Sequence, residues 1–173
     1  MERDDPKVKV SVCLPTYNGA RFIHSAIESV LNQSFADFEL IVCDDASTDS
    51  TLELVCGIHD ERLHVYRNSD RLGLVGNWNR CLELISGDYV VLMHQDDLMH
   101  VNNLAHKVAL LDGYPAVGFV YSNIRRIDES GSVIGGHWLP QAETDLIEPG
   151  MECFQRLVLQ RKVRGESSKL SQF

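Results

Sequence analysis

The sequence has no apolar run approaching the roughly 20 residues that a membrane-spanning helix needs. Its first residues, 1–6, are polar, so we expect neither a transmembrane segment nor a secretory signal. The 173 residues are 44% hydrophobic and 24% charged, which is ordinary for a globular protein in water. These features predict a cytoplasmic protein built on one main domain.

Basic residues are scarce in this sequence. Lys and Arg number 16 against 25 Asp and Glu, which gives a formal net charge of −9. Binding to a nucleic-acid backbone depends on Lys and Arg side chains that displace counterions, so we expect no nucleic-acid partner. An acidic protein can still bind a phosphate compound when a divalent cation bridges the two.

Several sequence motifs are also missing. The five cysteines form no CxxC pair and stand mostly in apolar segments, so we expect buried thiols in a reducing compartment. They are Cys13, Cys43, Cys56, Cys81 and Cys153. Neither GxGxxG nor GxxxxGK(S/T) occurs, which excludes the glycine cradles typical of dinucleotide and P-loop sites. A phosphate ligand would therefore be held by carboxylates through a cation.

Strand and helix patterns alternate along most of the chain. Runs of β-prone residues predict strands at 7–14, 38–43, 63–67, 89–93 and 116–122, and a hairpin at 124–128 and 132–135. Apolar residues at helical spacing predict helices at 20–33, 51–59, 75–86, 101–112 and 149–160. This order predicts an α/β fold, a mostly parallel Rossmann-like sheet flanked by helices.

The same patterns predict three parts of the chain. They are an N-terminal tail at 1–7, an α/β domain at 8–135, and a segment at 136–173 that holds the helix 149–160 and a disordered polar tail. The α/β alternation stops at the hairpin, which is why we place the boundary there.

Two local expectations concern the predicted elements 75–86 and 89–93. The apolar face of the helix is expected to consist of Val75, Trp78, Leu82 and Ile85, and Gly87 is expected to end it. The strand is short and continuously apolar, which favours burial on both faces of the sheet.

The strand 89–93 leads into His94-Gln95-Asp96-Asp97, which ends in adjacent carboxylates. Neighbouring carboxylates repel each other unless water, a donor or a cation screens them. A divalent metal site is one hypothesis, and a solvated turn that caps the next helix is the other. Because the strand-to-helix loops of a parallel sheet lie at one edge, the loops 15–19, 44–50 and 94–100 are predicted to converge.

Three ordered motifs carry a family resemblance. The runs VSVCLPTYNG, FELIVCDDASTDST and GDYVVLMHQDDL together resemble the nucleotide-sugar-binding half of the family 2 inverting glycosyltransferases, which have a GT-A fold. The resemblance covers about residues 8–135, and the order and spacing of the three motifs make it specific.

The resemblance implies roles for the first two motifs. Pro15, Thr16 and Tyr17 would line a nucleobase pocket, with the Tyr17 ring stacked on the base. Asp45 would accept the base N–H. Alternatively, Tyr17 is a turn residue that packs on its own helix, and Asp44 and Asp45 cap the helix that follows them.

The resemblance gives the third motif a metal-binding role. Gln95, Asp96 and Asp97 stand where the family has its acidic metal motif, with Asp96 directed to the ribose. Asp97 would bind the Mg²⁺ or Mn²⁺ that bridges the donor diphosphate. An alternative is an iron site made of His94, Asp97 and His100.

The sequence also departs from the family pattern. Many relatives have Arg-Asn where this chain has Trp78-Asn79, which leaves Arg71 or Arg80 for the contact with phosphate or base. The family's catalytic base is a later carboxylate, usually in an acidic pair. After residue 150 the chain has only Glu152 and Glu166, and neither belongs to such a pair. We therefore expect the donor half of the enzyme without the base, as in a truncated chain.

The resemblance implies transfer of a sugar from a nucleoside-diphosphate sugar, with UDP the favoured nucleotide, to a hydroxyl acceptor with inversion. Relatives often build polysaccharides at the cytoplasmic face of a membrane. Peripheral attachment of this chain to the inner face is therefore compatible with the resemblance. One alternative is a non-catalytic nucleotide-sugar-binding module or an inactive truncated product. A second is a phospho-acceptor receiver domain, whose paired acids also follow an early strand.

Overall fold

The computed structural model describes residues 8–122 and 124–135. The chain divides into two compact units, Met1–Leu110 and Leu111–Phe173. The first unit contains a parallel sheet with its helices, and the described part of the second contains a small hairpin. Within the described part of the chain, no helix has the length and apolar character required to cross a bilayer.

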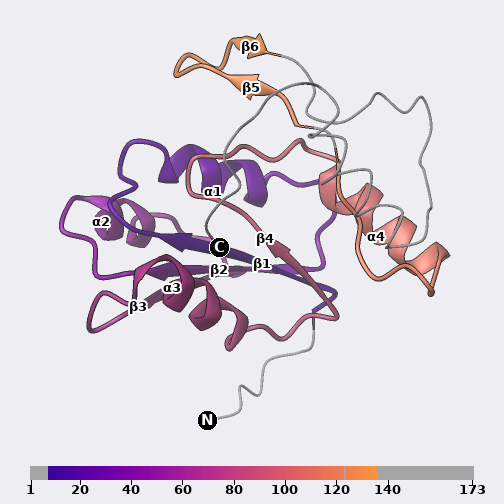
Figure 1. Cartoon of the computed structure of the whole chain (residues 1–173), viewed down its shortest axis with the longest axis horizontal. Helices are drawn as coiled ribbons and strands as arrows, with labels where there is room; N and C mark the ends of the chain where they lie inside the picture. The colour runs from indigo at the N-terminus through magenta and orange to yellow at the C-terminus, as the bar shows by residue number, and fades with distance from the viewer. Residues whose placement is uncertain (1–7, 123, 136–173) are drawn as a thin grey trace, which may run out of the picture. The chain divides into compact units, whose positions relative to one another are not determined.

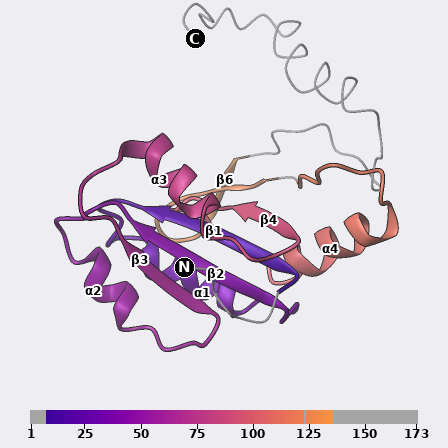
Figure 2. The ribbon, with the colours of Figure 1, turned by 90° about the horizontal axis from the view of Figure 1, so that it is seen from below.

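Four parallel strands form the sheet of the first unit, in the order β3-β2-β1-β4. Their bounds are β1 Val10–Thr16, β2 Phe38–Asp44, β3 Leu63–Arg67 and β4 Tyr89–Leu92. Figure 2 shows the four strands side by side. Because all four run the same way, their carboxyl ends share one edge, and β1 and β2 are the central pair.

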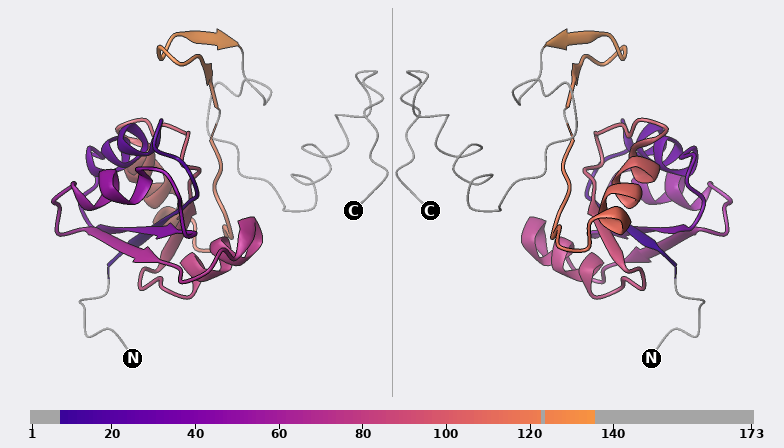
Figure 3. Two further views of the ribbon diagram at one scale, coloured as in Figure 1. Left: turned by 90° about the vertical axis from the view of Figure 1, so that its left-hand side faces the viewer. Right: turned by 90° about the vertical axis from the view of Figure 1, so that its right-hand side faces the viewer.

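Helices cover both faces of this sheet. They are α1 Ile23–Leu31, α2 Thr51–Cys56, α3 Gly73–Leu82 and α4 Asn103–Gly113. Figures 1 and 3 show α1 and α3 on opposite sides of the sheet. The larger apolar core joins β1 and β2 to α1, α2 and α4, and the smaller one joins the other sheet face to α3. The predicted α/β fold with a parallel, helix-flanked sheet is confirmed.

The helix α3 corrects one expectation. Its buried side chains are Asn77 and Cys81, whereas Val75 is 72% exposed. The helix also ends at Leu82, well before Gly87. The expected apolar face was wrong because a buried asparagine on this helix makes polar contacts with the sheet, and a hydrophobic pattern does not register such a residue.

The strand β4 corrects a second expectation. It pairs only with β1 in the described part of the chain, and Val90 and Leu92 are 40% and 42% exposed rather than buried. The segment 116–122 forms no strand in the structure. The hairpin was predicted correctly, as β5 Arg126–Ile127 pairs with β6 Val133–Gly135 in antiparallel fashion. The helix expected at 149–160 lies outside the described residues.

A buried glutamate fixes the start of β4. Glu39 Oε1 accepts hydrogen bonds from Ser11 Oγ at 2.6 Å and from Ser86 N and Oγ, both at 2.8 Å. Gly87 lies so close to β1 that an added Cβ would stand 2.6 Å from the Ser11 nitrogen. A glycine is therefore required where the chain enters β4, and this contact sets the register of β4 on β1.

Candidate functional site

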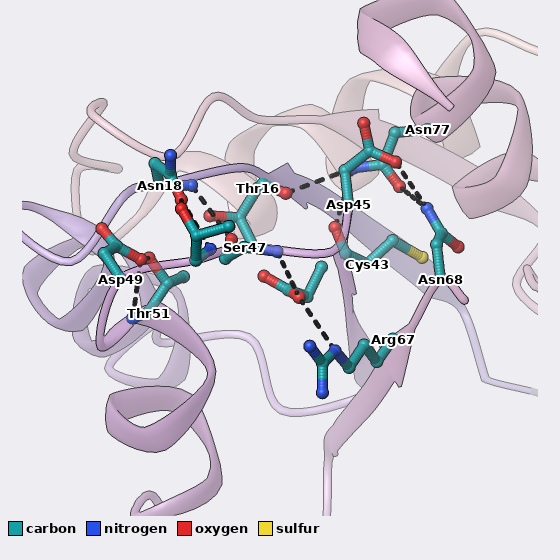
Figure 4. A network of polar contacts seen from close by, with 12 residues as sticks. Thr16, Asn18, Cys43, Asp45, Ser47, Asp49, Thr51, Arg67, Asn68 and Asn77 are labelled. Carbon is teal, nitrogen blue, oxygen red and sulfur yellow. Dashed lines mark hydrogen bonds and ion pairs between the residues drawn. The ribbon is translucent and has the colours of Figure 1, made fainter. Parts of the chain in front are cut away.

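The loops after β1 and β2 are joined by hydrogen bonds at the carboxyl edge of the sheet (Figure 4). Asn18 N donates to Ser47 Oγ at 3.0 Å, and Gly19 N donates to Thr51 Oγ1 at 2.8 Å. The Asp45 amide donates to the Thr16 carbonyl at 2.9 Å. These bonds hold two loops that lie about thirty residues apart in the sequence as one rigid layer.

Backbone strain accompanies this layer. Asn18 and Ala46 have φ values of 48° and 56°, in the left-handed region that non-glycine residues rarely occupy. Asn18 offsets the cost locally because its side-chain Oδ1 accepts the Thr48 amide at 2.9 Å. Ala46 has no polar side chain with which to do so, and its conformation is imposed by the bonds on either side of it.

Asp45 is buried and accepts three hydrogen bonds from this chain. Its Oδ1 accepts from Leu72 N at 2.7 Å and Asn68 Nδ2 at 3.0 Å, and its Oδ2 accepts from Gly73 N at 2.9 Å. The carboxylate therefore fixes the start of α3 against the end of β2. It does not cap α2, so that alternative for Asp45 was wrong. Asp49, not Asp44 or Asp45, bonds to the first residue of α2, through the Thr51 amide.

Two buried asparagines extend this network, and sequence reasoning missed both. Asn77 Nδ2 donates to the Cys43 carbonyl at 2.8 Å, and Asn77 Oδ1 accepts from Asn68 Nδ2 at 2.9 Å (Figure 4). A polar residue inside an otherwise apolar helix pattern is a signal that points to such a contact.

Gln95 attaches the segment after β4 to the loop after β1. Its Oε1 accepts from Thr16 Oγ1 at 2.6 Å and from Tyr17 N at 3.0 Å. We call these two hydrogen bonds of Gln95 the Gln95 clasp. It requires glycine at position 19, because an added Cβ there would lie 2.4 Å from Gln95 Oε1. The loops after β1, β2 and β4 therefore meet at one edge of the sheet.

The far side of the same segment is held by the end of α1. Gln33 Nε2 donates to the His100 carbonyl at 2.8 Å, Gln33 Oε1 accepts from Leu104 N at 3.1 Å, and Ser29 Oγ accepts from Met99 N at 3.0 Å. The residues between Gln95 and Met99 are thus anchored at both ends, and they include the two adjacent carboxylates.

Asp96 and Asp97 differ from the other acids of the site. Both side chains are exposed, and neither makes a side-chain hydrogen bond or an ion pair with any described residue. Partial burial raises the pKa of the Asp97 carboxyl; the His94 imidazole opposes this increase, and the Asp96 charge adds to it. The folded protein therefore disfavours the ionised form of Asp97.

Tyr17 and Arg71 are brought together from separate loops. The Arg71 guanidinium carbon lies 4.0 Å from the centre of the Tyr17 ring, which is cation–π geometry. Arg80 is instead engaged with Glu83 on the exposed side of α3, at 2.9 Å. Of the two arginines considered for a ligand contact, only Arg71 lies at this edge. The Tyr17 ring therefore contacts a residue of a different loop.

Two aromatic side chains meet beside the carboxylates. The rings of Trp78, from α3, and His94, which follows β4, have centroids 5.2 Å apart and are tilted by 57°. The rings form a tilted pair whose centroid separation lies in the range of favourable aromatic contacts. No group of three His, Cys, Asp or Glu residues among those described is arranged to hold a metal, so the iron site of His94, Asp97 and His100 is not formed.

The structure thus places the predicted site residues on loops that touch one another. Pro15 and Thr16 end β1 and Tyr17 follows it, Asp45 follows β2, and Arg71 precedes α3. Asp96 and Asp97 follow β4. Their roles toward a ligand stay predictions. Among the cysteines, Cys13, Cys43 and Cys81 are buried as expected, and Cys56 is exposed.

The sequence matches the family described as Glycosyl transferase family 2 over residues 11–161. It is 36% identical over 146 residues to the putative glycosyltransferase EpsE of Bacillus subtilis, covering 83% of this chain and 51% of that protein. It is 33% identical to WfgD of Escherichia coli, a UDP-Glc:α-D-GlcNAc-diphosphoundecaprenol β-1,3-glucosyltransferase, covering 78% and 53%. The chain spans about half the length of these curated relatives.

Solved structures are similar as well. Residues 1–349 of TarS of S. aureus in complex with UDP have a TM-score of 0.59 and 32% identity, covering 62% of this chain and 33% of that fragment. The mannosyltransferase PcManGT of Pyrobaculum calidifontis, in complex with GDP-Man and Mn²⁺, has a TM-score of 0.59 and 30% identity, covering 65% and 34%. By its sequence match and its fold, the chain belongs to the family 2 glycosyltransferases.

Proposed function

We propose that this chain binds a nucleoside-diphosphate sugar, with UDP as the favoured nucleotide, and serves transfer of the sugar to a hydroxyl acceptor with inversion. The observation that carries this proposal is the junction of three loops at one sheet edge through Thr16, Asp45 and Gln95. The complexes of TarS with UDP and of PcManGT with GDP-Man support a nucleotide-sugar ligand.

The base-binding end of the site consists of Pro15, Thr16, Tyr17, Asp45 and Arg71. A nucleobase would stack on the Tyr17 ring, whose face Arg71 covers in the free chain. The Asp45 carboxylate already accepts three hydrogen bonds, and a carboxylate has about four acceptor positions, so one remains for a base N–H. Asp45 would then both organise the loop and read the base.

The diphosphate end consists of Asp96 and Asp97. Mg²⁺ is typically held by one or two carboxylates and completes its coordination with substrate phosphates and water, so a pair of adjacent exposed carboxylates fits this ion or Mn²⁺. Asp97 is the residue we assign to the cation, because its carboxylate is exposed and makes no hydrogen bond or ion pair with a described residue. Asp96 is assigned to the ribose. When bound, the cation offsets the charge that develops on the departing diphosphate.

In an inverting transfer, the acceptor hydroxyl attacks the anomeric carbon while the bond to the diphosphate oxygen breaks, and a base removes the hydroxyl proton. We assign no residue to this base; Glu152 and Glu166 lie outside the described residues. The diphosphoundecaprenol-linked acceptor in the name of WfgD supports a hydroxyl acceptor on a lipid carrier. We propose that this chain meets such an acceptor at the cytoplasmic face of a membrane.

The proposal is tested by calorimetric titration of the chain with UDP, with and without Mn²⁺, followed by incubation with a labelled UDP-sugar. We expect binding that requires Mn²⁺ and is lost in Asp97→Asn. Glu83→Gln removes a charge from the exposed side of α3 and is the matched control that retains binding. Metal-dependent binding with no turnover of the donor supports the binding-module alternative. No binding of UDP, UDP-sugar or GDP contradicts the proposal.

A further inference from the structure

The contact between Trp78 and His94 links α3 to the segment after β4. The ring centroids are 5.2 Å apart. Among the described residues, no other pair of aromatic rings joins α3 to the segment after β4. The two elements belong to different strand-to-helix connections. His94 is exposed, so the contact is not a by-product of burying the imidazole in a core.

The Trp78 side of this contact is firmly placed. The preceding residue, Asn77, donates to the Cys43 carbonyl and accepts from Asn68, which fixes this turn of α3 on the sheet. The Trp78 Nε1 atom is buried and has no hydrogen-bond partner in the described structure. The orientation of the indole is therefore determined by packing, and His94 is an aromatic ring in contact with it.

The residues after β4 are held on opposite sides. Gln95 is attached to the loop after β1 through Thr16 and Tyr17, and His94 contacts α3 through Trp78. Asp96 and Asp97 come next, and their side chains have no hydrogen-bond partner among the described residues. The direction in which these carboxylates leave the sheet is thus controlled by the two residues immediately before them.

We propose that Trp78 and His94 are positioning residues, whose ring contact holds the chain after β4 so that Asp97 is placed to share a divalent cation with a nucleoside diphosphate. This inference rests on the proposed function. It assigns Trp78 the role of a lateral support for the acidic pair.

A double-mutant cycle tests this proposal, with UDP affinity measured by calorimetry in the presence and absence of Mn²⁺. We expect His94→Ala and Trp78→Leu each to weaken the Mn²⁺-dependent affinity by roughly two- to tenfold, the range of an aromatic pair. The double variant should be no weaker than either single variant. His94→Phe retains a ring and should restore most of the affinity, and metal-free binding should be unchanged throughout.

Emission from Trp78 gives a second measurement. The chain has two tryptophans, so the Trp138→Phe variant leaves Trp78 as the sole emitter. Mn²⁺ with UDP should change its emission, and the change should be absent in His94→Ala. If all the variants bind as tightly as the parent, or if His94→Phe is as weak as His94→Ala, the positioning role is wrong while the proposed function stands. If the parent itself shows no metal-dependent UDP binding, the proposed function fails.

Discussion

The loop after β2 and the segment after β4 carry acids in the same kind of position, yet these acids have different surroundings. Asp45 is buried and accepts three hydrogen bonds, and Asp49 accepts bonds from the Thr51 amide and hydroxyl. Asp96 and Asp97 are exposed and have no such partner among the described residues. The comparison separates acids that build the site from acids that remain available to a ligand.

This difference has an energetic consequence. A carboxylate that accepts several hydrogen bonds in the folded state stabilises the fold. A carboxylate whose pKa is raised on folding does the opposite when it is ionised. The acids of the first region are therefore satisfied by the fold itself, whereas those of the second have no hydrogen-bond partner among the described residues. The predictions below test this contrast, from the largest expected effect to the smallest.

Replacing Asp45 should have the largest effect on stability. Asp45→Ala leaves Leu72 N, Gly73 N and Asn68 Nδ2 without their acceptor, and we expect a loss of about 3 kcal/mol because hydrogen bonds to a charged group are stronger than neutral ones. Urea denaturation measures this loss. A loss as small as that of an exposed surface acid would remove the distinction between the two regions.

Gly19→Ala should break the Gln95 clasp, which joins the segment after β4 to the loop after β1. The new Cβ would lie 2.4 Å from Gln95 Oε1 and overlap with it, and we expect a loss of about 2 kcal/mol, typical of overpacking at a tight contact. Thermal unfolding provides the measurement. Gln95→Ala in the Gly19→Ala background should add little further loss, because the same contact is already broken; additive losses would contradict this coupling.

Ala46→Gly should stabilise the chain slightly. The residue has a left-handed backbone with φ of 56°, and relief of its strain, less the greater flexibility of glycine, leaves about 0.5 kcal/mol. A higher urea midpoint for the Ala46→Gly variant, with an unchanged dependence of the unfolding free energy on urea concentration, would confirm this prediction. Unchanged or lower stability would mean that the loop carries no strain at this residue.

The pH dependence of stability should differ in sign between Asp49 and Asp97. The Thr51 hydroxyl, with further hydrogen bonds, holds the pKa of the Asp49 carboxyl below its ordinary value of 3.8. Its stabilising contribution is therefore complete above pH 3.8 and is lost as the pH falls through the folded pKa. Asp49→Asn should destabilise the chain at neutral pH and matter less in acid.

Asp97 should show the opposite trend. Burial raises the pKa of its carboxyl above 3.8, so ionisation costs stability increasingly as the pH rises from 3.8 through the folded value. The stability of the Asp97→Asn variant relative to the parent should therefore increase as the pH rises over that interval. Urea midpoints measured across acid pH check both residues, and parallel curves for the two variants would contradict the comparison.

Much of the fold was predictable because its signals are local. The strand at 63–67 was placed correctly, and the convergence of the three loops followed from the parallel sheet alone. The face of α3 was not predictable, because Asn77 is buried for polar contacts with residues distant in the sequence. The exposure of Val90 and Leu92 was missed since a run of apolar residues does not reveal how many neighbouring strands a strand will have.

The site was predictable to a smaller extent. The acids were found by their spacing, but which of them are satisfied by the fold depends on backbone amides such as Leu72 N, which leave no trace in a residue pattern. The Gln95 clasp and the Trp78–His94 contact were missed because each joins side chains that lie far apart in the sequence. Residue types indicated which edge of the sheet holds the site. Only the structure showed which of its acids are bonded within the fold and which are exposed.

The most direct test of this division is urea unfolding of the parent chain and Asp97→Asn, each with and without Mn²⁺ plus UDP. Without ligand, the variant should be as stable as the parent or slightly more so. With ligand, only the parent should gain stability, because binding to the folded state alone raises the free energy of unfolding. An Asp97→Asn variant that loses as much stability without ligand as Asp45→Ala, or that gains as much with ligand as the parent, would contradict the account.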